Sequence, residues 1–212
     1  MSWQGCDDFL ERVTSRLVPL YEKGDQREGG DIHNMPEDER ARLRDASVLI
    51  GIVDRHNGDP SVILTERPKT MAKHPGQVAF PGGKVDPVDK GVVAAALREA
   101  HEEVGIEPED VSLLGRSDLY LTRTGFRITP VIGLLPSDFV AQPDPHEVDD
   151  VFETPLSFLM NPDNHIKKTA IWRGAPRTYL EMPHNGRYIW GVTAGVIRAL
   201  YERLYEDGEA QS

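Results

Sequence analysis

The part of the chain that most constrains its fold is residues 80–106, which read "FPGGKVDPVDKGVVAAALREAHEEVGI". Two adjacent glycines, which permit a sharp turn, follow a short apolar run. Apolar residues then recur at helical spacing until Gly105 supplies a stop signal. We expect a short strand over residues 77–83, a tight turn and a helix, with Asp86 as the helix N-cap and Asp89 in the first turn.

The second half of this helix carries glutamates that repel one another. Glu99, Glu102 and Glu103 stand at positions i, i+3 and i+4, where like charges destabilise a helix by about 0.2–0.5 kcal/mol per pair. Negative charge is also unfavourable near a helix C-terminus. A divalent cation reverses both effects, because Mg²⁺ prefers carboxylate oxygens as ligands. The alternative is a solvated acidic face, but the Gly-Gly turn beside the helix favours a metal site.

The remaining patterns predict a mixed α/β fold. An apolar stripe on the same helix must face a core and consists of Val93, Ala96, Leu97, Ala100 and Val104. Strand patterns occupy residues 47–55, 61–68, 111–122, 127–136 and two segments within 166–190, and helical patterns occupy 7–22, 191–206 and a segment from Pro36. Because hairpins and crossovers are mixed, we expect a central mixed β-sheet between helices. Residues 1–45 are expected to form an N-terminal helical arm, and residues 46–212 the main domain.

The composition excludes several classes of function. The formal charge of -11 repels phosphates, which disfavours nucleic-acid binding. The single cysteine, Cys6, excludes an internal disulfide and a cysteine-based zinc cluster. We find neither a signal-peptide pattern nor an apolar run as long as a membrane span. We therefore expect a soluble, cytoplasmic protein, in which an anionic substrate requires a metal ion or well-placed Arg and Lys residues.

Together these residues resemble a known family. The Nudix box, glycine–x5–Glu–x7–Arg–Glu–x2–Glu–Glu–x–Gly, is similar to the pattern made by Gly83, Asp89, Arg98, Glu99, Glu102, Glu103 and Gly105. Asp89 replaces the usual glutamate, and the gap that follows it is one residue longer; both departures resemble the coenzyme A pyrophosphatase branch. A second signature of that branch is similar to residues 62–83, "VILTERPKTMAKHPGQVAFPGG", in which Ala72 stands where arginine is common.

The resemblance covers residues 47–206 and implies a fold and an activity. The fold would be a Nudix-type α/β/α sandwich. The enzyme would use Mg²⁺ or Mn²⁺ to hydrolyse the pyrophosphate bond of coenzyme A or its thioesters, giving 3′,5′-ADP and 4′-phosphopantetheine. The alternative substrates are other nucleoside diphosphate derivatives, such as ADP-ribose, NADH or a dinucleoside polyphosphate. A catalytically silent binding module is a weaker alternative, because the box glutamates are retained.

The same resemblance implies roles for individual residues. Glu99 and Glu103 would be the principal metal ligands, followed by Glu102 and a backbone carbonyl at Gly83. Arg98 would orient a glutamate through a charge-assisted pair. Glu147, in a polar loop, would supply a metal ligand or a base, and which glutamate acts as the general base stays open. Contacts to the phosphates of a small nucleotide substrate would come from Arg67, Lys73, His74 and Gln77, although for His74 we favour hydrogen bonding to the Gly-Gly turn. A homodimer is compatible with the N-terminal arm.

Overall fold

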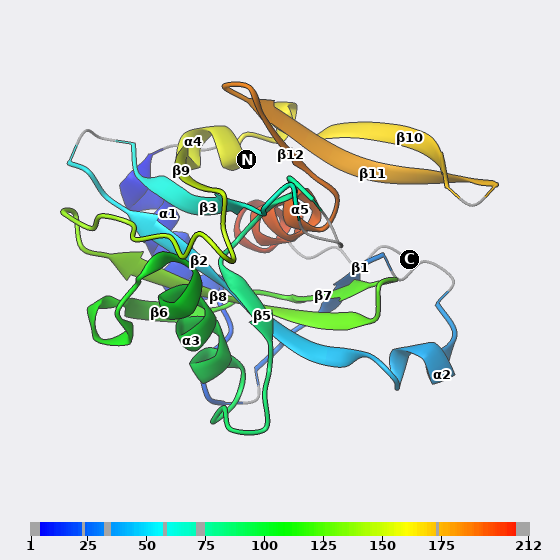
Figure 1. Cartoon of the computed structure of the whole chain (residues 1–212), viewed down its shortest axis with the longest axis horizontal. Coiled ribbons are helices and arrows are strands. Elements are labelled where there is room, and N and C mark those ends of the chain that lie inside the picture. Colours follow the sequence, from blue (N-terminus) through cyan, green and yellow to red (C-terminus); the bar gives the residue numbers. More distant parts are fainter. Residues whose placement is uncertain are drawn as a thin grey trace.

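The computed structural model describes residues 5–22, 24–31, 35–56, 59–70, 75–172 and 174–206. Its strands form two sheets (Figure 1). The main sheet contains β1 (Glu28–Gly30), β2 (Arg44–Val53), β3 (Ser61–Glu66), β4 (Val78–Ala79), β5 (Gly82–Lys84), β6 (Ser112–Arg116), β7 (Leu119–Thr122), β8 (Phe126–Leu135) and β9 (Asp150–Pro155). The smaller sheet contains β10 (Ile166–Trp172), β11 (Ala175–His184) and β12 (Arg187–Trp190). The helices are α1 (Cys6–Arg16), α2 (Glu37–Arg40), α3 (Val92–Val104), α4 (Leu156–Leu159) and α5 (Gly191–Tyr205).

The main sheet is mixed, as the sequence predicts. Its strands follow the order β1-β7-β8-β2-β3-β4. The central pair, β2 and β8, is parallel from Arg44 opposite Phe126 to Val53 opposite Leu135. Strand β7 runs antiparallel to β8, and β3 runs antiparallel to both β2 and β9. The predicted α/β fold with a central mixed sheet and flanking helices is therefore confirmed.

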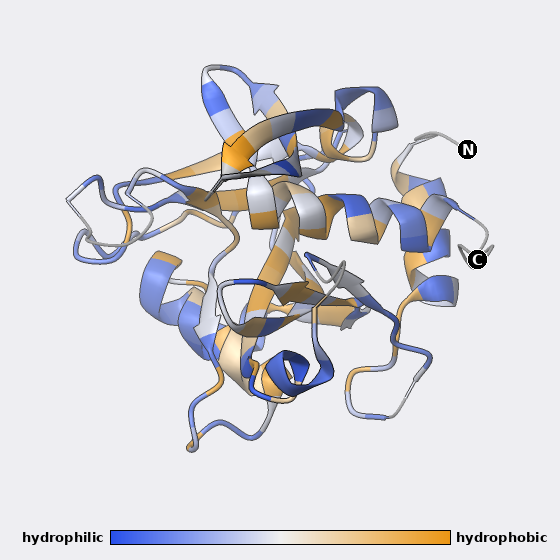
Figure 2. Ribbon diagram, turned by 90° about the vertical axis from the view of Figure 1, so that its right-hand side faces the viewer, coloured by the Kyte–Doolittle hydropathy of each residue, from blue (hydrophilic) through white to orange (hydrophobic). Residues whose placement is uncertain are grey.

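Strand β2 contributes residues to two cores, one on each side of the sheet. Ile50 and Ile52 belong to a cluster that includes residues of α1 and α5. Leu49 and Val53 belong to a second cluster, together with residues of α3. Such a strand is buried on both faces, so it reads as a continuous apolar run. Figure 1 shows α3 on one side of the sheet and α5 on the other, and Figure 2 shows hydrophobic residues concentrated between these helices.

Helix α3 ends where the sequence predicts. It stops at Gly105, whose φ of 70° is left-handed and whose N–H donates to the His101 carbonyl at 2.9 Å, while the Ile106 N–H donates to the Ala100 carbonyl at 3.3 Å. The predicted apolar stripe is buried, apart from Leu97, which is partly buried against the second core. This stripe fixes the rotation of the helix and thereby decides which glutamates face the sheet.

The start of α3 corrects one prediction. Asp86 is not the N-cap, because the helix begins later, after Gly91. Asp89 lies outside the helix and accepts a hydrogen bond from the Asp86 N–H at 2.7 Å. Its carboxylate also accepts the Arg98 Nε–H at 2.9 Å. The Asp89 carboxylate therefore binds Arg98 and does not cap the helix. A local pattern of capping residues does not reveal this long-range contact.

The N-terminal segment packs against the main sheet. Phe9 and Val13 of α1 are buried in the same core as α5. Helix α1 ends at Arg16, before the predicted residue 22, because Val18 leaves the helix to form a β-bridge with Arg116. Further along, β1 adds a parallel strand beside β7 at the edge of the sheet, which the sequence did not predict.

Three expectations about organisation stay predictions: the division into an arm (1–45) and a domain (46–212), the possible homodimer and the cytoplasmic location. Strand β2 already begins at Arg44, just before the expected boundary. None of the helices in the described stretches is both long and apolar enough to span a bilayer.

A buried carboxylate holds the N-terminal segment in place. Asp118 accepts hydrogen bonds from the backbone N–H of Arg27 at 3.0 Å and from its Nε–H at 3.1 Å. It also pairs with Arg203 of α5, whose side chain is only 9% exposed. Arg203 in turn donates to the carbonyls of Arg16 at 2.6 Å and Asp25 at 3.1 Å.

We expect Asp118→Ala to destabilise the protein by about 3–5 kcal/mol, because it leaves the Arg203 charge buried without its carboxylate. Urea denaturation measures this loss. Asp45→Ala is the matched control: it breaks a pair with Arg127 in which both side chains are substantially exposed, so a change below about 1 kcal/mol is expected. Equal losses in the two variants would contradict the assignment.

Candidate active site

Strand β5 approaches helix α3 so closely that one residue has no room for a side chain. A Cβ atom on Gly83 would lie 2.4 Å from Cδ of Glu99 and 2.5 Å from each of its carboxylate oxygens. Gly82 is equally restricted, because a Cβ atom there would lie 2.5 Å from the carbonyl oxygen of Ser47. The glycine pair therefore lets the carboxylates of α3 lie directly against a strand.

Glu103 is the most deeply buried acid of the site. Its side chain is almost fully enclosed, and its Oε2 accepts the N–H of Gly82 at 3.1 Å. Burial raises the pKa of Glu103 to about 8, and the nearby charges of Glu99 and Glu147 add to this, while the Gly82 hydrogen bond and Arg67 oppose it. Burial also raises the pKa of Glu99, against the influence of Arg98. Two acids whose ionised forms are disfavoured therefore face one cleft.

Arg98 contacts two of the three box glutamates, Glu99 and Glu102. Its Nη1 lies 3.1 Å from Glu99 Oε1 and donates to Glu102 Oε2 at 2.9 Å. The hydrogen bond with Asp89 is the largest cause that raises the pKa of Arg98, so the guanidinium remains charged. The Glu102 side chain is half exposed, and it does not line the cleft. The reason is the helical rotation of about 100° per residue, which puts Glu103 nearer than Glu102 to the direction of Glu99.

Glu147 reaches the cleft from a loop far away in sequence. The backbone N–H of Asp144 donates to the Glu103 carbonyl at 3.0 Å, which fastens this loop to the end of α3. The N–H groups of Glu147 and Val148 both donate back to the Asp144 carbonyl, which forms a turn, and Val148 is buried. Glu147 thereby lines the same cleft as Glu99 and Glu103.

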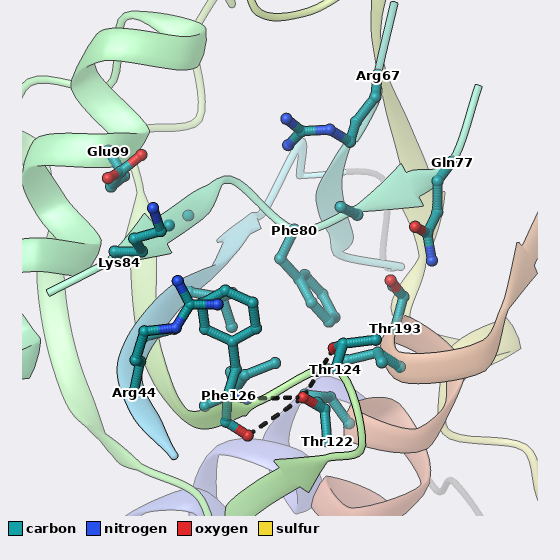
Figure 3. A pocket seen from close by; sticks show the side chains of 18 of the residues that line it. Arg44, Arg67, Gln77, Phe80, Lys84, Glu99, Thr122, Thr124, Phe126 and Thr193 are labelled. Carbon is teal, nitrogen blue, oxygen red and sulfur yellow. Dashed lines mark hydrogen bonds between the residues drawn. The ribbon is translucent and has the colours of Figure 1, made fainter. Parts of the chain in front are cut away.

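The cleft has a volume of about 950 Å³, and basic side chains as well as the glutamates line it (Figure 3). Arg67 and Gln77 of the second signature both line it. Two backbone hydrogen bonds hold this part of the chain: Arg67 N–H to the Gln77 carbonyl at 3.0 Å, and Gly76 N–H to the Arg67 carbonyl at 3.1 Å. Residues 71–74 lie outside the described residues, so the roles expected of Lys73 and His74 stay predictions.

Several lining residues were not predicted from the sequence: Arg44, Phe80, Lys84, Thr122, Arg123, Thr124, Phe126, Ile128, Val192, Thr193 and Val196. A local signal existed for Arg44, because it alternates with Ala46 and Val48 on one face of β2. No local signal existed for Phe126, which meets Arg44 only through the pairing of β2 with β8.

The donor set suits a hard divalent cation. Within the described residues, no three acidic, histidine or cysteine side chains are close enough together to form a complete metal centre. Glu99, Glu103 and Glu147 nevertheless line one cleft, and carboxylate oxygens are the ligands that Mg²⁺ prefers, completed by water and phosphate oxygens. The raised pKa values of Glu99 and Glu103 fit the same conclusion, because a cation favours their ionised forms. The Gly83 carbonyl as a further ligand stays a prediction.

Comparison with known proteins identifies the family. Residues 43–173 match the model of the NUDIX domain. A protein of Enterobacter sp. (strain 638), described as the uncharacterized Nudix hydrolase NudL, is 44% identical over 157 residues, 74% of this chain and 81% of its own. A protein of Cronobacter sakazakii with the same description is 41% identical over 173 residues, 81% of this chain and 89% of its own. The crystal structure of RenU, a Nudix hydrolase from M. smegmatis, is similar in fold, with a TM-score of 0.52, 20% identity, and coverage of 76% of this chain and 84% of its own.

The fold and the relatives define an enzyme that hydrolyses phosphoric anhydrides. The chain belongs to the Nudix family and is a Nudix pyrophosphohydrolase. The family predicted from residues 83–105 is therefore confirmed. Nudix enzymes bind nucleotide-derived small molecules and typically use a divalent metal ion.

We expect Glu103→Gln to reduce turnover with Mg²⁺ roughly a hundredfold or more, since even partners outside the metal ligands are worth 10–100-fold. In metal-free protein the variant should raise Tm, and more at pH 8 than at pH 5. The pKa of Glu103 is raised to about 8 from 4.5, so the wild type loses stability as the pH rises across that range. Glutamine removes this dependence.

Thermal unfolding in a chelator at both pH values, together with steady-state kinetics, measures these effects. Glu102→Gln is the control, because this neighbouring glutamate is half exposed, and its Tm should change little at either pH. Wild-type turnover in Glu103→Gln, or a Tm difference that does not grow with pH, would contradict the assignment.

We expect Gly83→Ala to lower kcat/KM roughly a hundredfold, because the new Cβ atom displaces the Glu99 carboxylate and small displacements in a site have effects of that size. Gly29→Ala is the control: its Cβ atom would meet only the Leu119 carbonyl oxygen, at an ordinary 3.8 Å. Kinetics and a crystal structure of Gly83→Ala test this. An active variant with Glu99 unmoved would rule out the steric explanation.

Proposed function

We propose that this enzyme hydrolyses the pyrophosphate bond of coenzyme A or its thioesters, with Mg²⁺ or Mn²⁺ as its metal ion. The observation that carries the proposal is that two sequence signatures converge on one cleft: Glu99 and Glu103 of the Nudix box, and Arg67 and Gln77 of residues 62–83. The second signature resembles that of the coenzyme A pyrophosphatases. The products would be 3′,5′-ADP and 4′-phosphopantetheine, or its acylated form.

Glu99 and Glu103 supply the carboxylates that would hold the metal ion. When bound, a divalent cation neutralises the diphosphate oxygens and lowers the pKa of a coordinated water. Arg98 keeps Glu99 in place through the contact at 3.1 Å, and the Gly82 N–H keeps Glu103 in place through the hydrogen bond at 3.1 Å. These contacts lock the two side chains before substrate arrives, which is the positioning on which phosphoryl transfer depends.

Arg67 and Glu147 both line the cleft, where they would act on the substrate. The Arg67 guanidinium would bind a phosphate oxygen through a charge-assisted hydrogen bond. Water adds to one phosphorus atom, the bridging P–O bond breaks, and the water proton passes to a carboxylate. We assign that proton to Glu147, which is exposed at the cleft surface, because Glu99 and Glu103 are committed to the metal ion.

The alternative is a Nudix hydrolase of ADP-ribose, NADH or a dinucleoside polyphosphate. The same glutamates would serve these substrates, since the chemistry occurs at a diphosphate in each case. The choice among these substrates therefore depends on residues that contact the rest of the nucleotide. Arg67 and Gln77 favour coenzyme A only because they belong to the second signature.

Mass spectrometry of the products tests the proposal. Purified protein with millimolar Mg²⁺ or Mn²⁺ is incubated separately with coenzyme A, acetyl-coenzyme A, ADP-ribose and NADH, and Glu99→Gln serves as the inactive control. We expect 3′,5′-ADP from the first two substrates at a kcat/KM well above that for the others. Preferential hydrolysis of ADP-ribose or NADH would refute the coenzyme A assignment and leave the Nudix activity intact.

A further inference from the structure

One wall of the cleft is basic and aromatic and is built by β2 and β8, outside both signatures. Arg44, Ala46 and Val48 alternate along one face of β2, and all three line the cleft. Phe126 and Ile128 lie on the paired stretch of β8, and they line it as well. The wall is therefore a continuous surface of two hydrogen-bonded strands.

Arg44 is held toward the cleft by its surroundings. Its guanidinium carbon lies 4.4 Å from the centroid of the Phe126 ring, a cation–π contact visible in Figure 3. Its backbone N–H donates to the Gly125 carbonyl at 3.0 Å. The Thr122 hydroxyl oxygen accepts the N–H of Phe126 at 3.0 Å, which fixes the turn that carries the ring. The ring and the guanidinium thus form a rigid unit.

The neighbouring residues on the same two strands provide an internal comparison. Asp45 and Arg127 follow Arg44 and Phe126 in register and form an ion pair at 3.2 Å. Among the described residues, by contrast, no carboxylate lies within ion-pair distance of the Arg44 guanidinium. In a chain with a formal charge of -11, an arginine held in a substrate cleft without an acidic partner is available to an anion from outside.

A second cation stands beside this wall. Lys84 of β5 pairs with Ala46 of β2 and lines the same part of the cleft, near Arg44 (Figure 3). On β2, Arg44 is three residues from Ser47, which pairs with Gly83 of β5. Gly83 in turn lies against the Glu99 carboxylate. At about 3.3 Å per residue this separates the two sites by about 10 Å along the strand. That separation lies within the dimensions of one nucleotide.

We propose that Arg44, assisted by Lys84, binds a second phosphate group of the substrate, separate from the diphosphate held near the glutamates. The proposal rests on the proposed function and narrows it to nucleoside diphosphates that also carry a phosphate on the ribose. The 3′-phosphate of coenzyme A is such a group, and ADP-ribose and NADH have no equivalent. A guanidinium suits this role because it presents paired N–H donors to phosphate oxygens.

Kinetics with coenzyme A and dephospho-coenzyme A, which lacks only the 3′-phosphate, test the proposal. In the wild type we expect kcat/KM to be roughly tenfold higher for coenzyme A, the lower end expected for a charged hydrogen bond at an exposed site. Arg44→Gln should abolish this preference by raising KM for coenzyme A, with kcat nearly unchanged and dephospho-coenzyme A unaffected. Arg44→Lys should restore part of the preference.

Arg127→Gln is the matched control, because this arginine lies one position along β8 and pairs with Asp45. It should keep the wild-type preference. Equal kcat/KM for the two substrates in the wild type would overturn the inference and leave the proposed function standing. An equal loss for both substrates in Arg44→Gln would also overturn it, because Arg44 would then act on the diphosphate.

Calorimetric binding of 3′,5′-ADP and 5′-AMP decides the question without turnover. Tighter binding of 3′,5′-ADP by the wild type, lost in Arg44→Gln, supports the second phosphate site. Equal affinities overturn it. If neither coenzyme A nor dephospho-coenzyme A is hydrolysed, the proposed function fails, and this binding result still decides the subsite.

Discussion

The contact between strand β5 and helix α3 is the constraint on which the rest of the site depends. Each residue of β5 meets a box residue on α3: Gly82 donates its N–H to Glu103, Gly83 lies against the Glu99 carboxylate, and the Lys84 carbonyl accepts a hydrogen bond from Arg98. A side chain at position 83 would separate the two elements. Strand and helix therefore act as one unit, and the apolar stripe of α3 anchors that unit in the second core.

Burial makes the ionised carboxylates of this site unfavourable. Burial raises the pKa of both Glu99 and Glu103, so their ionised forms are destabilised in the absence of a cation. Around them the cleft carries Arg44, Arg67, Lys84 and Arg123, although the whole chain has a formal charge of -11. Acidic and basic side chains therefore line the same cleft.

The sequence predicted the fold class because its signals were local. Apolar periodicity gave the face of α3 that is buried, and Gly105 gave its end. The start of α3 could not be found in this way, because Asp89 is bound by Arg98, nine positions further along, instead of capping the helix. Glu102 was grouped with the other glutamates by its spacing, and the structure shows its carboxylate half exposed beside Arg98, outside the lining of the cleft.

By itself the sequence determined the family and the strand–glycine–helix unit, because each depends on neighbours within a few positions along the chain. Only the tertiary structure decided which glutamates share the cleft and which other residues line it. Glu147 arrives there through a loop fastened to the Glu103 carbonyl, and Phe126 meets Arg44 through the pairing of β8 with β2. Such contacts join residues tens of positions apart, and they follow from packing around a shared core, which no local pattern encodes.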